Sequence, residues 1–139
     1  MISKDPVISI IIPNYNHAQY ISDAIESVLA QTFRDFEIIV IDDGSTDNTR
    51  EVVARFGDAV KYIWKENAGL PAARNTGIEL AKGEFIGVLD ADDMYEPEFM
   101  STLAPILIAN PDVDAVYCGY QFVDHLNNPL PQKEARDIP

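Results

Sequence analysis

The sequence predicts an α/β fold, with a mainly parallel β-sheet that carries helices on both faces. Short apolar runs alternate along the chain with segments whose apolar residues recur at helical spacing, which is the pattern of such folds. Three runs, residues 7–12, 37–41 and 85–89, are nearly continuous and rich in β-branched residues, as expected for strands covered on both faces. With 139 residues, the chain has the length of one domain.

Two weaker runs complete the predicted set of strands. Residues 60–64 are expected to form the third strand and residues 115–123 the fifth. Right-handed crossovers between parallel strands would bring every carboxyl end to one edge of the sheet. Ligands of such sheets bind at this edge, near the point where the strand order reverses.

The first two helices are predicted from spacing and capping. After a turn at residues 14–17, five apolar residues recur on one helical face: Ile21, Ala24, Ile25, Val28 and Leu29. A second helix would carry Val52, Val53 and Phe56, and Ser45 and Thr46 would cap its start.

Two further helices follow. Residues 70–81 predict the third, with Gly83 just past its end. Residues 98–109 predict the fourth, because Pro97 suits its start and the Asn-Pro pair at 110–111 its stop. Pro105 in the interior predicts a kink or an early break.

The composition of the chain argues against several classes of binding partner. Ten basic against twenty-three acidic residues give a formal net charge of −13, which argues against nucleic acid and anionic lipid as partners. Cys118 is the only cysteine, so no internal disulfide forms, and its apolar neighbours predict a small buried side chain. No signal peptide or membrane-spanning run is visible, so the predicted location is the cytoplasm. We expect one domain at residues 1–125 and a polar tail or linker at 126–139.

Polar residues follow three of the predicted strands. They are Pro-Asn-Tyr-Asn at 13–16, Asp-Asp-Gly-Ser-Thr-Asp at 42–47 and Asp-Ala-Asp-Asp at 90–93. Because the carboxyl ends of parallel strands meet at one edge, these three segments are expected to converge. Their convergence predicts a binding site at that edge.

The stretch FIGVLDADDMYEP places three carboxylates directly after an apolar strand. Asp90, Asp92 and Asp93 repel one another, and burial would raise their pKa values. A hard divalent cation, Mg²⁺ or Mn²⁺, would relieve the repulsion, and it often takes only one or two protein ligands besides phosphates. A solvated acidic turn at a helix N-terminus explains the Asp-x-Asp tripeptide equally well. The spacing of an EF-hand is absent.

Three more side chains can bind a ligand at this edge, and each also has a structural explanation. Asp43 can accept hydrogen bonds from a base or sugar, or belong to a capped turn. Tyr15 can stack on a planar base or pack on the domain. Arg74 can reach a phosphate or lie on a helix surface. His17 and His125 are poor metal candidates, because the sequence has no histidine cluster.

Three stretches together resemble the family 2 glycosyltransferases of the GT-A fold. They are SIIIPNYNHAQYISDAIESVLAQTFRDFEIIVIDDGSTDNT, ENAGLPAARNTGIELAKGEFIGVLDADD and the following MYEPEFM, in the family's order and spacing. The resemblance implies a Rossmann-like GT-A fold, a nucleotide-sugar donor (most often a UDP-sugar) and a Mn²⁺ or Mg²⁺ cofactor. It also implies inverting transfer to a saccharide, lipid-linked or other hydroxyl acceptor, in cell-wall or polysaccharide synthesis.

The resemblance assigns the nucleoside end of the donor to the first two strand ends. By motif position, Pro13 and Tyr15 would flank the uracil. Asp43 would hydrogen-bond the uracil edge, and Asp42 lies beside it. Family members vary in which of these two carboxylates contributes more.

The resemblance assigns the diphosphate end to the fourth strand and the third helix. Arg74 would lie near the diphosphate or the nucleotide, and Asp90 would approach the ribose. Asp92 would ligate the metal, with Asp93 as a further ligand.

The catalytic base is expected elsewhere. In the family it lies in the acceptor-binding half, which would follow Pro139, so we expect donor and metal binding from this chain and no catalytic residue. Asp124, Glu134 and Asp137 lie too close to the fifth strand, or in the tail, to serve as the base. The sequence leaves open whether the full-length protein attaches to the inner face of the membrane and whether it forms a homo-oligomer.

Other classes of protein fit less well. A sugar nucleotidyltransferase would want a glycine-rich basic loop after the first strand, where Pro-Asn-Tyr-Asn stands at residues 13–16. A phosphoryl-transfer receiver or phosphatase would want a lysine at a later strand end. A non-catalytic nucleotide-sugar-binding module has the same sequence features as the donor half of an enzyme.

Overall fold

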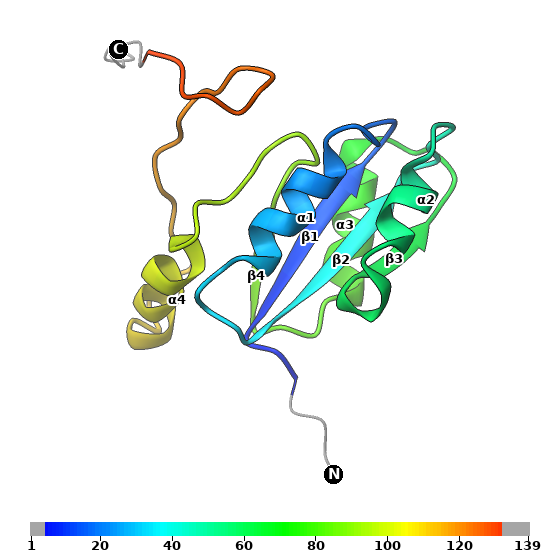
Figure 1. Cartoon of the computed structure of the whole chain (residues 1–139). Helices are drawn as coiled ribbons and strands as arrows, with labels where there is room; N and C mark the ends of the chain where they lie inside the picture. Colours follow the sequence, from blue (N-terminus) through cyan, green and yellow to red (C-terminus); the bar gives the residue numbers. More distant parts are fainter. Residues whose placement is uncertain (1–4, 132–139) are drawn as a thin grey trace, which may run out of the picture.

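A computed structural model of the chain describes residues 5–131. Its centre is a sheet of four strands in the order β3-β2-β1-β4, and all three pairings are parallel (Figure 1). The strands are β1 (Ile8–Asn14), β2 (Phe36–Asp42), β3 (Lys61–Trp64) and β4 (Phe85–Val88). The predicted parallel α/β fold is confirmed, and these four strands fall where the apolar runs placed them.

The strand order reverses at β1. Strands β2 and β3 lie on one side of it in chain order, and β4 lies on the other side. The pairing of β1 with β2 ends at Asn14 opposite Asp42, and the pairing of β1 with β4 includes Ile11 opposite Val88. The carboxyl ends of β1, β2 and β4 therefore meet at the switch point where α/β sheets bind ligands.

Helices cover both faces of the sheet. They are α1 (Ile21–Leu29), α2 (Thr49–Ala54), α3 (Leu70–Leu80) and α4 (Phe99–Ala109), and a short 3₁₀ helix, η1 (Gly57–Ala59), follows α2. Helices α1 and α2 lie on one face and α3 on the other, while α4 lies beside the β4 edge (Figure 1).

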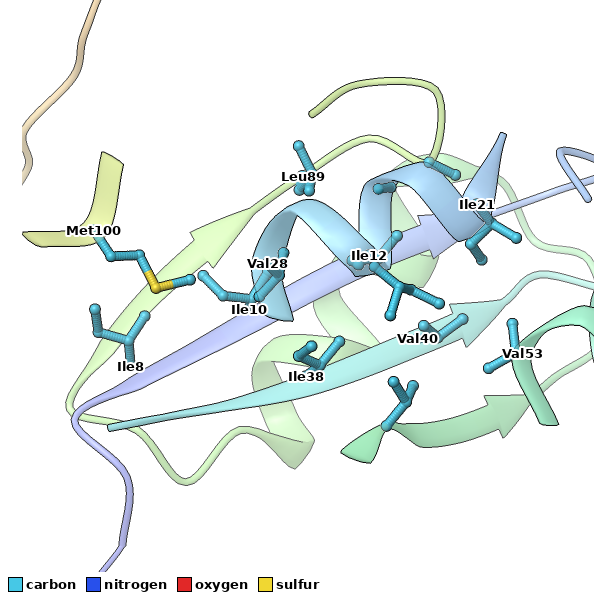
Figure 2. Close-up of a cluster of buried hydrophobic side chains, with 14 of the residues drawn as sticks. Ile8, Ile10, Ile12, Ile21, Val28, Ile38, Val40, Val53, Leu89 and Met100 are labelled. Atoms are coloured by element: carbon cyan, nitrogen blue, oxygen red, sulfur yellow. The ribbon is translucent and has the colours of Figure 1, made fainter. Parts of the chain in front are cut away.

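Strand β1 is buried along its whole length, because it has a strand on either side and helices on both faces. Ile10 and Ile12 belong to the core cluster under α1 and α2, which Figure 2 shows. Ile11 points the other way and belongs to the cluster under α3. Successive residues of a strand face opposite sides, so a strand between two cores is apolar at every position.

Helix α1 packs through one apolar stripe. Ile21, Ala24, Ile25 and Val28 are fully buried, at positions i, i+3, i+4 and i+7. Truncating Ile25 to alanine would remove a buried side chain and leave a cavity, at a cost of about 2–5 kcal/mol.

Helix α3 approaches the sheet closely through Gly77. A Cβ at this position would overlap the side chain of Ile11. Glycine therefore sets the distance between α3 and β1, and with it the position of the loop that precedes α3. The prediction of this helix over residues 70–81 is confirmed to within one residue.

The predicted start and end of the second helix are wrong. Helix α2 begins at Thr49 and no side chain caps it, so Ser45 and Thr46 are not its caps. Both residues instead bond to the loop after β1, as described below. Phe56 lies beyond the end of α2, where it precedes η1 and packs against the core under α1 and α2.

Helix α4 continues through Pro105 to Ala109, so the early break expected there does not occur. A proline in a helix removes one N–H donor, and the turns on either side keep their own bonds. Met100 and Ala104 of this helix are buried against the main core cluster, which holds the helix in place.

The strand predicted over residues 115–123 is wrong. In the described part of the chain this segment joins no strand, and it makes one isolated antiparallel bridge, from Val123 to Pro129. Cys118 is exposed rather than buried. Three large aromatic side chains here are also exposed: Tyr117, Tyr120 and Phe122. The residues suit a strand, but a strand needs a neighbouring edge, and this segment runs away from the sheet (Figure 1).

The predicted tail lies partly outside the described residues. Within residues 126–131 the chain turns back on Asp124, whose Oδ1 accepts the backbone N–H groups of Leu126 and Asn128. Glu134 and Asp137 lie outside the described part. Within residues 5–131, no helix has both the length and the apolar character needed to cross a bilayer.

Candidate functional site

A pocket of about 540 Å³ opens at the carboxyl edge of the sheet. It is lined by residues that follow all four strands and by the start of α3: Pro13, Asn14, Tyr15, His17, Asp43, Asn67, Gly69, Leu70, Ala73, Asp90, Ala91 and Asp92. Five of the residues predicted to bind ligand are therefore together: Pro13, Tyr15, Asp43, Asp90 and Asp92. Asp42, Arg74 and Asp93 do not line the pocket.

A second hollow, of about 400 Å³, lies at the opposite end of β2 and β3. Its charged residues come in both signs, with Arg34 and Lys61 beside Glu37 and Asp58. None of the predicted site residues lines it. Of the two hollows, therefore, only the 540 Å³ pocket is lined by residues that were predicted to bind a ligand.

Asn16 fixes the loop after β1 to the loop after β2. It adopts a positive φ of 56°, which asparagine tolerates better than most residues. Its Oδ1 accepts the backbone N–H groups of Thr46 at 2.8 Å and Asp47 at 3.3 Å. Its own N–H donates to Ser45 Oγ at 2.9 Å. One asparagine thus holds the first two walls of the pocket together.

Asn14 and Asp47 strengthen the same junction. The Nδ2 of Asn14 donates to Ser45 Oγ at 3.1 Å and to Thr49 Oγ1 at 3.0 Å. Asp47 Oδ2 accepts the N–H of Ala18 at 3.0 Å, and Oδ1 accepts the Thr49 hydroxyl at 2.6 Å. Burial raises the pKa of Asp47, but these hydrogen bonds outweigh burial and leave it below the ordinary value.

Asp43 is held by three donors. Its side chain is 4% exposed, and Oδ1 accepts Lys65 Nζ at 2.7 Å and Ala68 N–H at 3.0 Å. Its Oδ2 accepts Gly69 N–H at 2.8 Å. Burial raises the pKa of Asp43, but the lysine and the two backbone donors together bring it below the ordinary value. The carboxylate is therefore ionised, and its position on the pocket wall is fixed.

Asp42 faces into the protein rather than the pocket. It is 1% exposed, its Oδ1 accepts Ser45 N–H at 2.8 Å, and its Oδ2 accepts the hydroxyl of Tyr62. Burial, and then the bond to Asp42, raise the pKa of Tyr62 to about 12. These contacts give Asp42 a role in shaping the loop that presents Asp43.

Arg74 reaches the pocket through Asp90. Its Nη2 donates to Asp90 Oδ1 at 2.7 Å, and the two side chains are 38% and 43% exposed, so the pair adds little stability by itself. Two buried polar atoms around the pocket, Arg74 Nε and Asn14 Oδ1, have no hydrogen-bond partner within residues 5–131. Unpaired buried groups of this kind are rare in folded proteins and are often found where a ligand or water completes the site.

The acidic turn lies on the β4 side of the pocket. Asp93 N–H donates to the Asp90 carbonyl at 3.0 Å, which closes the turn. Burial, and then the charges of Asp92 and Asp90, raise the pKa of Asp93. Asp92 and Asp93 are exposed, and their carboxylate oxygens are the ligand type that Mg²⁺ and Mn²⁺ prefer. Within the described residues, no three His, Cys, Asp or Glu side chains gather to enclose a metal.

The pocket wall formed by the end of β1 and the start of α3 combines apolar and aromatic surface. Tyr15 is 51% exposed and Leu70, at the start of α3, is 46% exposed. A half-exposed tyrosine ring at a pocket wall has a face free to stack on a planar group.

Sequence reasoning missed the loop between β3 and α3. Asn67 Nδ2 donates to the Asp43 carbonyl at 2.9 Å, and Gly69 adopts a φ of 91°, which favours glycine. Both line the pocket, as does His17. A usable signal was present, because Glu66 to Gly69 directly follows a predicted strand and must reach the same edge as the other three strand ends.

The protein is an α/β domain with a pocket at the switch point of its parallel sheet. The sequence model described as glycosyl transferase family 2 matches residues 9–137, and the chain belongs to this family. An uncharacterised glycosyltransferase of Rickettsia typhi is 45% identical over 127 residues, which cover 90% of this chain and 40% of that protein. The chain thus spans about 40% of the length of such curated relatives.

Solved structures confirm the GT-A fold. S. aureus TarS 1–349 in complex with UDP-GlcNAc superposes with a TM-score of 0.69 at 32% identity, covering 73% of this chain and 31% of that one. The mannosyltransferase PcManGT from Pyrobaculum calidifontis in complex with GDP-Man and Mn²⁺ gives a TM-score of 0.72 at 28% identity. That match covers 80% of this chain and 34% of the mannosyltransferase.

Proposed function

We propose that this domain binds a nucleotide-sugar donor, a UDP-sugar, together with Mn²⁺ or Mg²⁺, and that the whole protein transfers the sugar to a hydroxyl acceptor with inversion. The observation that carries the proposal is that five predicted donor-binding and metal-binding residues line one pocket at the switch point of a family 2 domain. The complexes of TarS with UDP-GlcNAc and of PcManGT with GDP-Man and Mn²⁺ support it.

The nucleoside would bind between β1 and α3. Tyr15 and Pro13 offer the surface that would flank the base. Asp43 would accept an N–H of the base edge, because a carboxylate with three fixed donors still has acceptor capacity for one more. Asp42 would act by holding the Asp43 loop in shape.

The diphosphate would bind between Arg74 and the acidic turn. Asp90 would approach the ribose, and Arg74 would offer its guanidinium to the diphosphate or nucleotide. Asp92, with Asp93, would hold the divalent cation. The cation would then offset the repulsion between these carboxylates and the diphosphate. When bound, such a cation stabilises the charge that develops on the leaving diphosphate.

The transfer step requires a second group. The acceptor oxygen would attack the anomeric carbon from the face opposite the diphosphate, the bond to the diphosphate would break, and the acceptor proton would pass to a carboxylate base. We assign that base to the acceptor-binding half of the protein, after residue 139. Saccharide or lipid-linked alcohols are the acceptor classes we propose.

A thermal-shift screen of the full-length protein tests donor binding directly. UDP-sugars and GDP-sugars would be screened with and without Mn²⁺, since a ligand at one hundred times its Kd stabilises by about 2.7 kcal/mol. We expect the melting temperature to rise with a UDP-sugar and to rise further with Mn²⁺. Asp58→Asn, in the hollow at the other end of the sheet, is the matched control and should keep both shifts. No shift with any nucleotide sugar would contradict the proposal.

Product analysis tests the reaction. With the full-length protein and an accepted donor, the anomeric configuration of the product, followed by NMR, should be opposite to that of the donor. Retention of configuration would refute inversion. Donor binding without transfer to any hydroxyl acceptor would instead support a binding module.

A further inference from the structure

Gln31, just after α1, is buried with all its hydrogen-bonding groups in use. It is 1% exposed. Its Nε2 donates to the Ser27 carbonyl at 3.1 Å and to the Glu96 carbonyl at 2.7 Å, and its Oε1 accepts Met100 N–H at 2.9 Å. Two of these three bonds join residues 65 and 69 positions apart, so this one side chain ties the end of α1 to the chain that follows the acidic turn.

Neighbouring bonds hold the same segment. Tyr95 N–H donates to Ser27 Oγ at 3.1 Å, and Thr32 N–H donates to the Pro97 carbonyl at 3.0 Å. The Tyr95 hydroxyl donates to the Val88 carbonyl at 3.0 Å, so the segment is also fastened to the end of β4. Thr32 also binds the segment before and inside α4, through the Pro97 carbonyl and the Ser101 hydroxyl, but Thr32 is exposed. Gln31 differs because it makes its two contacts with the segment from a buried position.

The acidic turn lies between two fixed points. Before it, Leu89 N–H donates to the Ile11 carbonyl at 3.0 Å and extends the sheet. After it, Gln31 holds Glu96 and Met100. The three like charges in the turn tend to push its backbone apart. Fixed ends oppose that movement, and they keep the turn in one shape before any cation arrives.

We propose that Gln31 is a positioning residue for the acidic turn, acting through Glu96 and Met100 to set the geometry with which Asp92 and Asp93 meet a divalent cation. The proposal rests on the donor- and metal-binding function proposed above. Metal affinity depends on holding ligands close to their productive geometry, and a site left slightly loose loses much of it.

Gln31→Met is the informative change. Methionine has a similar length and fills the space, but it removes both donated bonds and the accepted one. The Glu96 carbonyl and the Met100 N–H then lose their partner, and the chain after the turn is held to α1 and the residues just after it only through Ser27 and Thr32. Val53→Ala is the control, because Val53 is buried on α2, on the same face of the sheet, and its aliphatic side chain forms no hydrogen bond to the segment that follows the acidic turn.

Calorimetry on the full-length proteins measures UDP affinity with and without Mn²⁺, at a temperature where every variant is folded. We expect the gain in UDP affinity on adding Mn²⁺ to be about tenfold smaller in Gln31→Met than in the wild type. Binding of UDP without metal should stay within about twofold, because Tyr15 and Asp43 lie on the other side of the pocket. Val53→Ala should keep the full gain from Mn²⁺. A full gain in Gln31→Met, or an equal loss in Val53→Ala, would overturn the proposal.

Hydrogen exchange separates failure of this inference from failure of the proposed function. The N–H groups of Asp93 and Tyr95 should exchange about tenfold faster in Gln31→Met than in Val53→Ala, because only the first change removes hydrogen bonds that hold the chain after the turn. Unchanged exchange at both positions would overturn the role of Gln31, whether or not UDP binds. If the wild-type protein showed no Mn²⁺-dependent UDP binding, the proposed function would fall and the exchange data would still judge the anchoring.

Discussion

Replacing Asp43 by asparagine changes a pocket carboxylate that three donors surround. The substitution keeps the size of the side chain and removes its charge. One of the two oxygens becomes an NH₂ group, which is itself a donor. Whichever way the amide is turned, it points hydrogens at Gly69 N–H or at Lys65 Nζ and Ala68 N–H. The change therefore breaks at least one bond and sets donor against donor.

The expected cost follows from these contacts. A hydrogen bond to a charged group contributes about 1.5–3 kcal/mol, and a buried donor left unsatisfied costs about 1–3 kcal/mol. Lys65 is 22% exposed and can return to water, which reduces the cost. We therefore expect Asp43→Asn to destabilise the domain by about 2–4 kcal/mol.

Urea unfolding followed by circular dichroism measures this cost, and Lys65→Met separates its parts. The lysine variant should cost less than Asp43→Asn, because the two backbone donors keep their acceptor. UDP affinity, measured by calorimetry, should fall in Asp43→Asn because the base would lose its acceptor. A loss of stability below about 0.5 kcal/mol together with unchanged UDP affinity would refute the reasoning.

Three further changes test the fold around the site. Asp43 and Asp47 have pKa values below the ordinary 3.8 in the folded protein, so the stability that they contribute is complete above that pH and is lost as the pH falls through the folded pKa values. Urea unfolding from about pH 6 to pH 2 should show this loss of stability, and the loss should be smaller in Asp43→Asn. Asn16→Gly keeps the positive φ accessible but removes the Oδ1 that accepts two backbone N–H groups, and the melting temperature should report a cost of about 1–3 kcal/mol. Gly77→Ala puts a methyl group into the sheet and should cost about 1–3 kcal/mol by urea unfolding, whereas Gly119→Ala, which meets open space, should change nothing.

The sequence was sufficient for the framework of the site. The apolar runs that became β1, β2 and β4 are long enough and β-branched enough to be recognised as strands covered on both faces. Once the sheet is parallel, the chain direction alone brings Pro13, Asp43 and Asp90 to one edge. Their proximity is a consequence of topology, so it could be predicted without any side-chain geometry.

The hydrogen-bonding partners could not be predicted in this way. Nothing local pairs Asp43 with Lys65, or directs Asp42 toward Tyr62, because each pair joins residues about twenty positions apart. The burial of Gln31 and its hydrogen-bonding partners could not be predicted either, since a glutamine after a helix is ordinarily a surface residue. Such roles depend on which loops meet in space.

The predicted fifth strand failed for a related reason. Residues 115–123 have the composition of a strand, but strand preference largely reflects packing against neighbours. In the described part of the chain no edge pairs with this segment, and its aromatic side chains, Tyr117 among them, are exposed. The same dependence on neighbours explains why the buried side chain predicted for Cys118 is wrong.

Calorimetric titration of UDP into the full-length protein, with and without Mn²⁺, for the wild type and for Asp92→Asn, tests the central claim most directly. We predict binding at one site that Mn²⁺ strengthens in the wild type. In Asp92→Asn, UDP should still bind without metal, and Mn²⁺ should no longer strengthen it, because a cation ligand has been lost. Absence of UDP binding, or an effect of Mn²⁺ that survives in Asp92→Asn, would contradict the account.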